Sequence, residues 1–267
     1  MLNLQLREPP PTLVEVFQIV PDRLAGMNVD QIMELPIHLG NRTARLGDWF
    51  SVSGDASDLH HCWTGDLTNV GGLGHGMSAG WIQIKGDAGN HVGTRMSGGT
   101  IHVSGSAGNY VGAEMTDGLI HVKGNAGNFV GAACDAGRSG QNGGAILIEG
   151  SAGGRVGSSM RRGLIAIGGD AGNGCGYTMN AGTIVVFGKV QERVGLEMTR
   201  GTILLMQEPT SEFAGFIDGG QHPMPVANLI DDYLSETGFS KLIGQRLFRL
   251  LHGDMIRGGR GEVLIVA

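Results

Sequence analysis

The sequence contains few of the residues from which common chemical sites are built. Its three cysteines lie far apart and form no CxxC pair, which argues against an iron–sulfur cluster, a zinc knuckle and a disulfide framework. Aromatic residues make up only 5% of the chain. No apolar run approaches the roughly 20 residues that span a bilayer, and the first residues do not resemble a secretion signal. We therefore expect a cytoplasmic protein that does not enter a membrane.

The charge balance and the glycine content exclude further classes. With 19 basic and 25 acidic residues the net charge is −6, which gives no basis for binding nucleic acid. The 49 glycines would destabilise a helix-rich domain, and they do not recur every third residue as collagen requires. A hydrophobic content of 41% argues against a disordered chain.

A 19-residue repeat explains the glycines. The first clear unit reads WIQIKGDAGNHVGTRMSGG, and units in register begin at Trp81, Thr100, Leu119, Ala145, Leu164 and Thr183, with a partial unit at Thr202–Met206. Seven extra residues, Arg138–Gly144, interrupt the series. An earlier, degenerate unit at Trp49–Gly80 contains thirteen extra residues, roughly Asp58–Val70.

Each repeat position has a physical interpretation. Ile or Val at positions 2 and 4 share one face of a strand, and Ala at 8, Val at 12 and Met at 16 supply further inward contacts. Glycines at 6, 9, 13 and 19 mark corners. Asn at position 10 tolerates a left-handed backbone and can form a stacked hydrogen-bonded ladder; these residues are Asn90, Asn109, Asn128 and Asn173.

One unit cannot bury its own apolar side, whereas stacked units can. The period is too short for a propeller blade, and the Leu/Asn consensus of leucine-rich repeats is missing. We predict an all-β protein, a right-handed parallel β-helix of about seven or eight coils over residues 49–207. Residues 1–48 and 208–267 are expected to form α/β caps, with helices at Asn28–Leu35, Val226–Leu234 and Lys241–Leu251 and a strand at Glu262–Val266.

The first insertion contains His60, His61, Cys62 and Trp63. Adjacent histidines diverge on an extended chain and no second cluster completes a ligand set, so we expect a loop that packs on a partner, with Trp63 as anchor. No metal site is predicted.

His102 and His121 fall on position 3 and should stack on the outer surface. Cys134 and Cys175 replace inward Met and Val and should act as small core residues.

Position 11 carries an aligned row, His91, Tyr110 and Phe129, followed by Arg155 and Arg193. Aligned aromatic residues form a patch, and patches tend to be interfaces.

Arg162 and Arg200 both fall on position 18, and Arg138 lies in the second insertion. These arginines are expected to form salt bridges, with Glu192 and Glu197 or with a partner, or to bind a polyanion. The glycine runs are not phosphate loops because no helix follows them. No catalytic constellation is present.

The run of I-x-V-x-G-x-A-G-N-x-V-G-x-x-M-x-x-G units over Trp49–Met206 resembles the β-helix of the C subunit of formylmethanofuran dehydrogenase and of the glutamate synthase large subunit. Leu46–Ser57 (LGDWFSVSGDAS) and Gly253–Val266 (GDMIRGGRGEVLIV) look like the dehydrogenase C subunits. The segment Asp58–Met77 is most similar to the C subunit of the bacterial formyltransferase/hydrolase complex.

The resemblance implies a function for the whole complex. Such a complex moves a formyl group from a tetrahydromethanopterin carrier to a methanofuran-type amine and then hydrolyses it to formate. Formyl transfer belongs to the D subunit and metal-dependent hydrolysis to the A subunit, so the resemblance implies a scaffold with partners of A, B and D type and no cofactor or metal on this chain. The glutamate-rich tail of methanofuran-type cofactors is one polyanion that the arginines could bind.

Three alternatives remain. The chain could be the C subunit of an archaeal-type formylmethanofuran dehydrogenase, or a glutamate-synthase-type scaffold bound to or fused with an amidotransferase. A β-helical polysaccharide lyase would need clustered Asp, Arg and Lys and a secretion signal.

Overall fold

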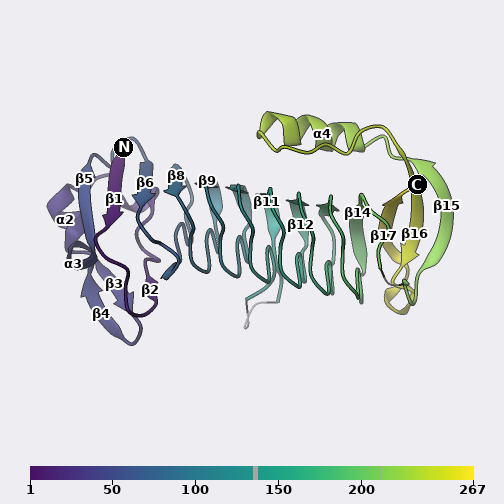
Figure 1. Ribbon diagram of the computed structural model, residues 1–267, viewed down its shortest axis with the longest axis horizontal. Helices are drawn as coiled ribbons and strands as arrows, with labels where there is room; N and C mark the ends of the chain where they lie inside the picture. The colour runs from purple at the N-terminus through teal and green to yellow at the C-terminus, as the bar shows by residue number, and fades with distance from the viewer. Residues whose placement is uncertain (135–137, 211) are drawn as a thin grey trace.

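A computed structural model describes residues 1–134, 138–210 and 212–267. Thirteen strands of these residues form one sheet, in the order β15-β16-β17-β14-β13-β12-β11-β10-β9-β8-β6-β1-β5. Figure 1 shows a long stack of short strands with a larger folded part at each end and a helix lying over the later repeats. The chain is therefore mostly β, as the sequence predicts.

The central strands follow the 19-residue repeat. Neighbouring strands pair in parallel with equivalent residues side by side, so that Ile82 lies opposite Ile101 and Ile101 opposite Ile120. The stacked strands are β6 (His60–Thr64), β8 (Trp81–Lys85), β9 (Ser97–Val103), β10 (Asp117–Val122), β11 (Asn142–Ile148), β12 (Arg162–Ile167), β13 (Thr183–Val186) and β14 (Arg200–Leu205).

The inward positions are those that the pattern predicts. Ile101, Val103, Val111 and Met115 have no exposed surface, and Ala107 is buried. The position-8 alanines add a second line of parallel bridges, including Ala88 with Ala107 and Ala107 with Ala126. Each repeat thus contributes equivalent side chains to one continuous core, because a single unit is too small to bury them.

Two details of the corners differ from the prediction. The left-handed backbone falls on position 11, as in Tyr110 (φ 63°), and not on the asparagine before it. The ladder also runs from side chain to backbone: Asn90 Oδ1 accepts from the Asn109 N–H at 2.7 Å, and Asn109 Oδ1 from the Asn128 N–H at 2.7 Å. Each amide thus satisfies a corner N–H that would otherwise be unpaired.

The first insertion is largely part of the stack. His60–Thr64 forms β6, which pairs in parallel with both β1 (Leu2–Leu6) and β8. The earlier segment Phe50–Gly54 is β5, antiparallel to β1 at the end of the sheet. The degenerate unit predicted at Trp49–Gly80 is therefore wrong in its first half, and the regular coils begin at His60.

The second insertion lies earlier than the sequence suggests. Asn142–Gly144 belong to β11, where Asn142 pairs with Arg162. Gln141 is fully buried, and its N–H donates to Gly131 O at 2.8 Å. In the preceding unit the N–H of Met115, at position 16, makes the equivalent hydrogen bond to the carbonyl of Gly112, at position 13. Gln141 therefore takes the place expected for Cys134, which is half-buried, whereas Cys175 lies in the core as predicted.

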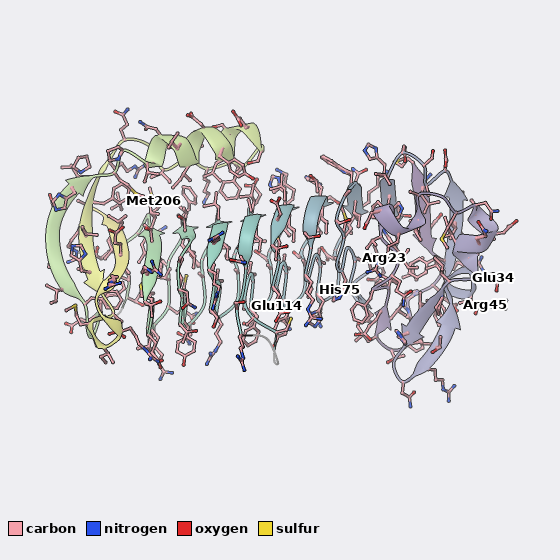
Figure 2. All side chains as sticks on the ribbon, turned by 180° about the vertical axis from the view of Figure 1, so that it is seen from behind. Arg23, Glu34, Arg45, His75, Glu114 and Met206 are labelled. Atoms are coloured by element: carbon pink, nitrogen blue, oxygen red, sulfur yellow. The ribbon has the colours of Figure 1, made fainter. Side chains whose placement is uncertain are left out.

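The N-terminal end adds short elements around the first coil. The helix predicted at Asn28–Leu35 is α2 (Val29–Met33), which begins with a capping box between Asn28 and Gln31. Glu34 and Arg45 face each other across a 3.1 Å ion pair (Figure 2). The other elements at this end are β2 (Val14–Glu15), α1 (Pro21–Leu24), β3 (Pro36–Leu39), β4 (Arg42–Arg45), α3 (Leu46–Trp49) and β7 (Val70–Gly71).

The C-terminal end extends the sheet and sends a helix back over it. β17 (Arg260–Val266) pairs in parallel with β14, and β16 (Leu247–Gly253) and β15 (Ile217–Pro223) follow in antiparallel order. The helix predicted over Lys241–Leu251 is wrong, because Leu247–Gly253 is held as a strand by pairing on both sides. Helix α4 (Ala227–Glu236) and the strand at Glu262–Val266 are confirmed; η1 (Met255–Arg257) precedes β17. None of the helices in the described ranges is long and apolar enough to cross a membrane.

Candidate functional site

The aromatic row at position 11 forms a stacked surface. The ring centroids of His91 and Tyr110 are 4.9 Å apart with planes 4° from parallel, and those of Tyr110 and Phe129 are 4.8 Å apart at 7°. All three residues have a left-handed φ between 63° and 66°, so successive rings leave the corner in the same direction at the spacing of parallel strands. The predicted alignment is confirmed, and its role as a partner interface stays a prediction.

Arginines continue this row on the later coils. The Arg155 guanidinium lies over the Tyr177 ring, 4.7 Å from its centroid, in a cation–π contact. Gly174 occupies position 11 of the next coil and offers no side chain. Arg193 lies exposed beyond it, beside Glu192 and Phe213.

A basic groove runs along a different side of the stack. It has a volume of about 720 Å³, and its lining includes Arg161, Arg162, Arg200, Asn142 and Asn180. Because β12, β13 and β14 pair in register, the position-18 residues Arg162 and Arg200 lie two strands apart, roughly 10 Å. The small Ala181 lies between them. The structure thus brings these two predicted residues into one groove and leaves Arg155 and Arg193 outside it.

The charge of this groove is not neutralised within the described part of the chain. Arg161, Arg162 and Arg200 form no ion pair there. Arg260 lies opposite Arg200 in β17 and adds positive charge. The salt bridge predicted to Glu197 is not formed by these arginines, because Glu197 pairs with Arg257.

Arg138 is exposed and adjoins residues 135–137, which lie outside the described ranges. It is not among the residues that line the basic groove.

Residues 224–246, which we call the C-terminal arm, cover the position-3 face of the later coils. A second apolar cluster forms here between the stack and the arm, and Met206 belongs to it (Figure 2). Its stack side consists of Leu147, Ala166, Val185, Phe187, Leu204 and Met206, and its arm side of Ala227, Leu234, Phe239 and Ile243.

A polar cluster fastens the tip of the arm. Glu149 accepts hydrogen bonds from the Ser240 N–H (3.1 Å) and hydroxyl, His121 Nε2 (2.9 Å) and Lys123 Nζ (3.1 Å). Burial acts to raise the pKa of Glu149, but the hydrogen bonds from Ser240, His121 and Lys123 outweigh it and lower the pKa to about 2. The carboxylate is therefore charged at neutral pH and ties the arm to the stack.

This arm corrects the prediction for the histidine pair. His102 and His121 do adjoin each other, with ring centroids 5.4 Å apart. His121, however, is buried beneath the arm, where burial lowers its pKa. Only His102 keeps partial exposure.

The cluster His60, His61 and Trp63 is also arranged differently from the prediction. His61 and Trp63 occupy inward positions 2 and 4 of β6, and Trp63 packs edge-on against Phe50. Trp63 is completely buried, so it cannot anchor an exposed loop on a partner. Burial lowers the pKa of His61 to about 4. His60 points outward beside the exposed Trp81.

Sequence reasoning missed the arm although a signal was present. Position 3 reads Gln83, His102 and His121 in the early coils but Leu147, Ala166, Val185 and Leu204 in the later ones. An outward position that becomes apolar indicates a covered face. No group of three or more His, Cys, Asp or Glu residues in the described ranges is placed to hold a metal ion.

The stack of parallel strands with glycine corners defines the chain as a glycine-rich repeat protein. The GXGXG motif family model matches residues 72–221, more than half of the chain. The chain is 31% identical to a subunit of the formyltransferase/hydrolase complex of Methylorubrum extorquens, solved with methylofuran, over 99% of both chains and with a TM-score of 0.87.

Other relatives align with a smaller part of this chain. The C subunit of the tungsten-containing formylmethanofuran dehydrogenase 2 of Methanothermobacter marburgensis is 38% identical over 33% of this chain and 34% of its own length. The C subunit of the molybdenum-containing enzyme 1 of Methanosarcina barkeri is 41% identical over 30% of this chain and 28% of its own length. The alignments thus span about a third of these relatives. The chain belongs to the family of formylmethanofuran dehydrogenase C subunits.

Proposed function

We propose that the chain is the non-catalytic scaffold subunit of a formyltransferase/hydrolase complex. The observation that carries this proposal is the similarity of 99% of the chain to a subunit of such a complex, at 31% identity and a TM-score of 0.87. The stack would then be a right-handed parallel β-helix that begins with β6 at His60 and runs to about residue 207, and the segments before and after it would be caps. In-register parallel pairing at the repeat period supports this architecture.

In this role the chain holds subunits of A, B and D type together. Their joint reaction transfers a formyl group from a tetrahydromethanopterin carrier to a methanofuran-type amine and releases it as formate. The catalytic metal belongs to another subunit, and no cofactor resides on this chain. The flat aromatic row His91, Tyr110 and Phe129 and the outward-facing His60 are the contact surfaces that we assign to these partners.

The test is purification of the tagged chain from its own cells, followed by mass spectrometry and assays. Three further subunits should co-purify, and the complex should hydrolyse the formyl group. The chain freed of its partners should neither transfer nor hydrolyse it. Turnover by the isolated chain would refute the scaffold role, and loss of all partners from the wild-type chain would refute the assembly.

The curated relatives favour a second candidate, the C subunit of a formylmethanofuran dehydrogenase, because these relatives belong to tungsten- and molybdenum-containing enzymes. Elemental analysis of the same purified complex separates the two candidates. Stoichiometric tungsten or molybdenum, with formate-dependent redox activity, would establish the dehydrogenase. A redox-inactive complex that lacks both metals would establish the hydrolase.

The basic groove suggests a further role for the same scaffold. Its arginines, which form no ion pair within residues 1–134, 138–210 and 212–267, can attract a polyanion, and the glutamate-rich tail of a methanofuran-type cofactor is one. Replacing Arg162 and Arg200 by Gln in the assembled complex should raise the apparent KM for the furan cofactor at low salt, and less so at high salt. Hydrolysis of a tail-less substrate should be unchanged. A KM that does not move at low salt would exclude this role.

A further inference from the structure

The basic groove continues into an apolar groove beneath helix α4. The apolar groove has a volume of about 380 Å³, and its lining includes Ala145 and Leu164 from the stack and Leu229, Ile230 and Tyr233 from the helix. Gly163 and Thr183 line both grooves. The two grooves therefore form one continuous surface, with an apolar half under the helix and a basic half across the position-18 row.

The apolar half remains open although the arm has its own core. Leu229 is 69% exposed and Tyr233 is 38% exposed, whereas the other face of α4 is buried through Ala227 and Leu234. Leu229 and Tyr233 line the same groove as Ile230, Ala145 and Leu164, and a contiguous apolar surface of this kind is typical of an interaction site. Ala227 and Leu234 pack the helix against the stack, and Ser240, just beyond the end of the helix, is bound to Glu149, so the surface is preformed.

The charge beside the apolar half limits what can cover it. Arg161, Arg162 and Arg200 lie along one side without ion pairs in the described part of the chain. A second copy of this groove would bring arginine against arginine, which costs free energy. A purely anionic tail, the occupant considered above, would satisfy the arginines but leave Leu229 uncovered. Such a tail and a mixed segment are therefore alternative occupants of this groove.

We propose that this continuous groove is the docking site for a segment of another subunit that carries apolar side chains followed by acidic ones. Apolar residues of the segment fill the space between Leu164, Leu229 and Tyr233. Its carboxylates pair with Arg162 and Arg200. The inference rests on the proposed function in one respect, that the chain is bound by other subunits.

Photo-crosslinking in the assembled complex locates the occupant. With p-benzoylphenylalanine in place of Leu229, irradiation should join the chain to one partner subunit, at a segment with apolar and acidic residues in succession. The same crosslinker in place of Ile256, which is 84% exposed on η1, is the matched control and should not yield that product. Crosslinks within this chain alone, to a second copy, or to a segment without acidic residues would overturn the inference.

Substitutions then test both halves. Leu229→Ser should weaken retention of that subunit about tenfold, as expected for removing a leucine side chain that the partner segment would bury. Arg162→Gln with Arg200→Gln should weaken it several-fold at low salt and much less at 0.5 M salt, roughly where screening becomes strong. Ile256→Ser and Arg23→Gln with Arg42→Gln are the controls, and they should change nothing.

The outcomes separate this inference from the proposed function. If the wild-type chain retains no subunits, the proposed assembly fails. If it retains them and both variants do too, the assembly stands and the docking site is refuted. If the arginine variant weakens cofactor use while Leu229→Ser has no effect, the groove binds an anionic tail and not a protein segment. An unchanged melting temperature will confirm that each variant folds.

Discussion

Replacing Val111 by Asp tests the register on which the whole stack depends. Val111 has no exposed surface. Its carbonyl accepts from the Gly131 N–H at 2.8 Å, while the adjacent Gly112 N–H donates to Val92 O at 2.8 Å. The side chain is thus enclosed between the equivalent valines of the coils on either side, Val92 and Val130.

The cost has two parts. Losing the buried valine removes about 2 kcal/mol of apolar transfer free energy. Burying a carboxylate with no partner adds several kcal/mol, or forces it to take up a proton. A domain is commonly stable by only about 5–15 kcal/mol, and at this size each kcal/mol lowers the melting temperature by about 2–4 °C. Val111→Asp should therefore melt at least about 10 °C lower than the wild type, or fail to fold.

Thr116→Asp is the matched control, five residues further along the same coil. Thr116 is exposed, and its hydroxyl makes only a 3.5 Å contact to Met96 O, so the change should cost about 0.5 kcal/mol or less. Thermal unfolding followed by circular dichroism measures both variants. If Val111→Asp melts with the wild type, or if the two variants are equally destabilised, the proposed register is wrong.

The stack was predictable because repetition makes each position visible six times. An isolated Val111 or Met115 says little, but a valine and a methionine at the same two positions of successive units indicate a shared inward face. Parallel pairing then places the residues at positions 1 to 4 of successive units side by side. The capping box at Asn28 was predictable for a different reason, since it depends only on residues three apart.

The errors lie where distant pairing decides the structure. Leu247–Gly253 has apolar residues at spacings that suit a helix, but β15 and β17 on either side hold it as a strand. In β6, His61 and Trp63 do not resemble the Ile and Val of later coils, and their inward positions are set by pairing with β1 and β8. Local sequence contains no information about those partners.

The candidate surfaces were predictable only in part. The alignment of Arg162 with Arg200 follows from the repeat period, and so does the row of His91, Tyr110 and Phe129. The apolar half of the docking groove does not, because it exists only where α4 folds back over the stack. Neither the direction of the arm nor the exposure of Leu229 can be derived from the repeat.

Three further predictions address the corners, the ladder and the arm. Gly118→Ala should lower the melting temperature more than Gly258→Ala: both have φ 99°, but a Cβ at Gly118 would lie 2.7 Å from Gly99 O, whereas at Gly258 it meets open space. Asn109→Ala should cost about 1–2 kcal/mol in chemical unfolding, because it leaves the Asn128 N–H without its side-chain acceptor; an unchanged midpoint would show that the ladder contributes nothing. The last concerns Glu149, whose pKa is lowered from 4.5 to about 2. Because this pKa is lower in the folded protein than in the unfolded chain, the stabilisation of the arm by the Glu149 carboxylate is complete above pH 4.5 and is lost as the pH falls toward 2. Hydrogen exchange in residues 227–236, corrected for intrinsic rates, should therefore accelerate over that window in the wild type. Glu149→Gln should show fast exchange already at neutral pH and a flatter profile, while the exposed Glu236→Gln should follow the wild type. If Glu149→Gln keeps both the protection and the pH dependence, the arm is held by its apolar contacts alone.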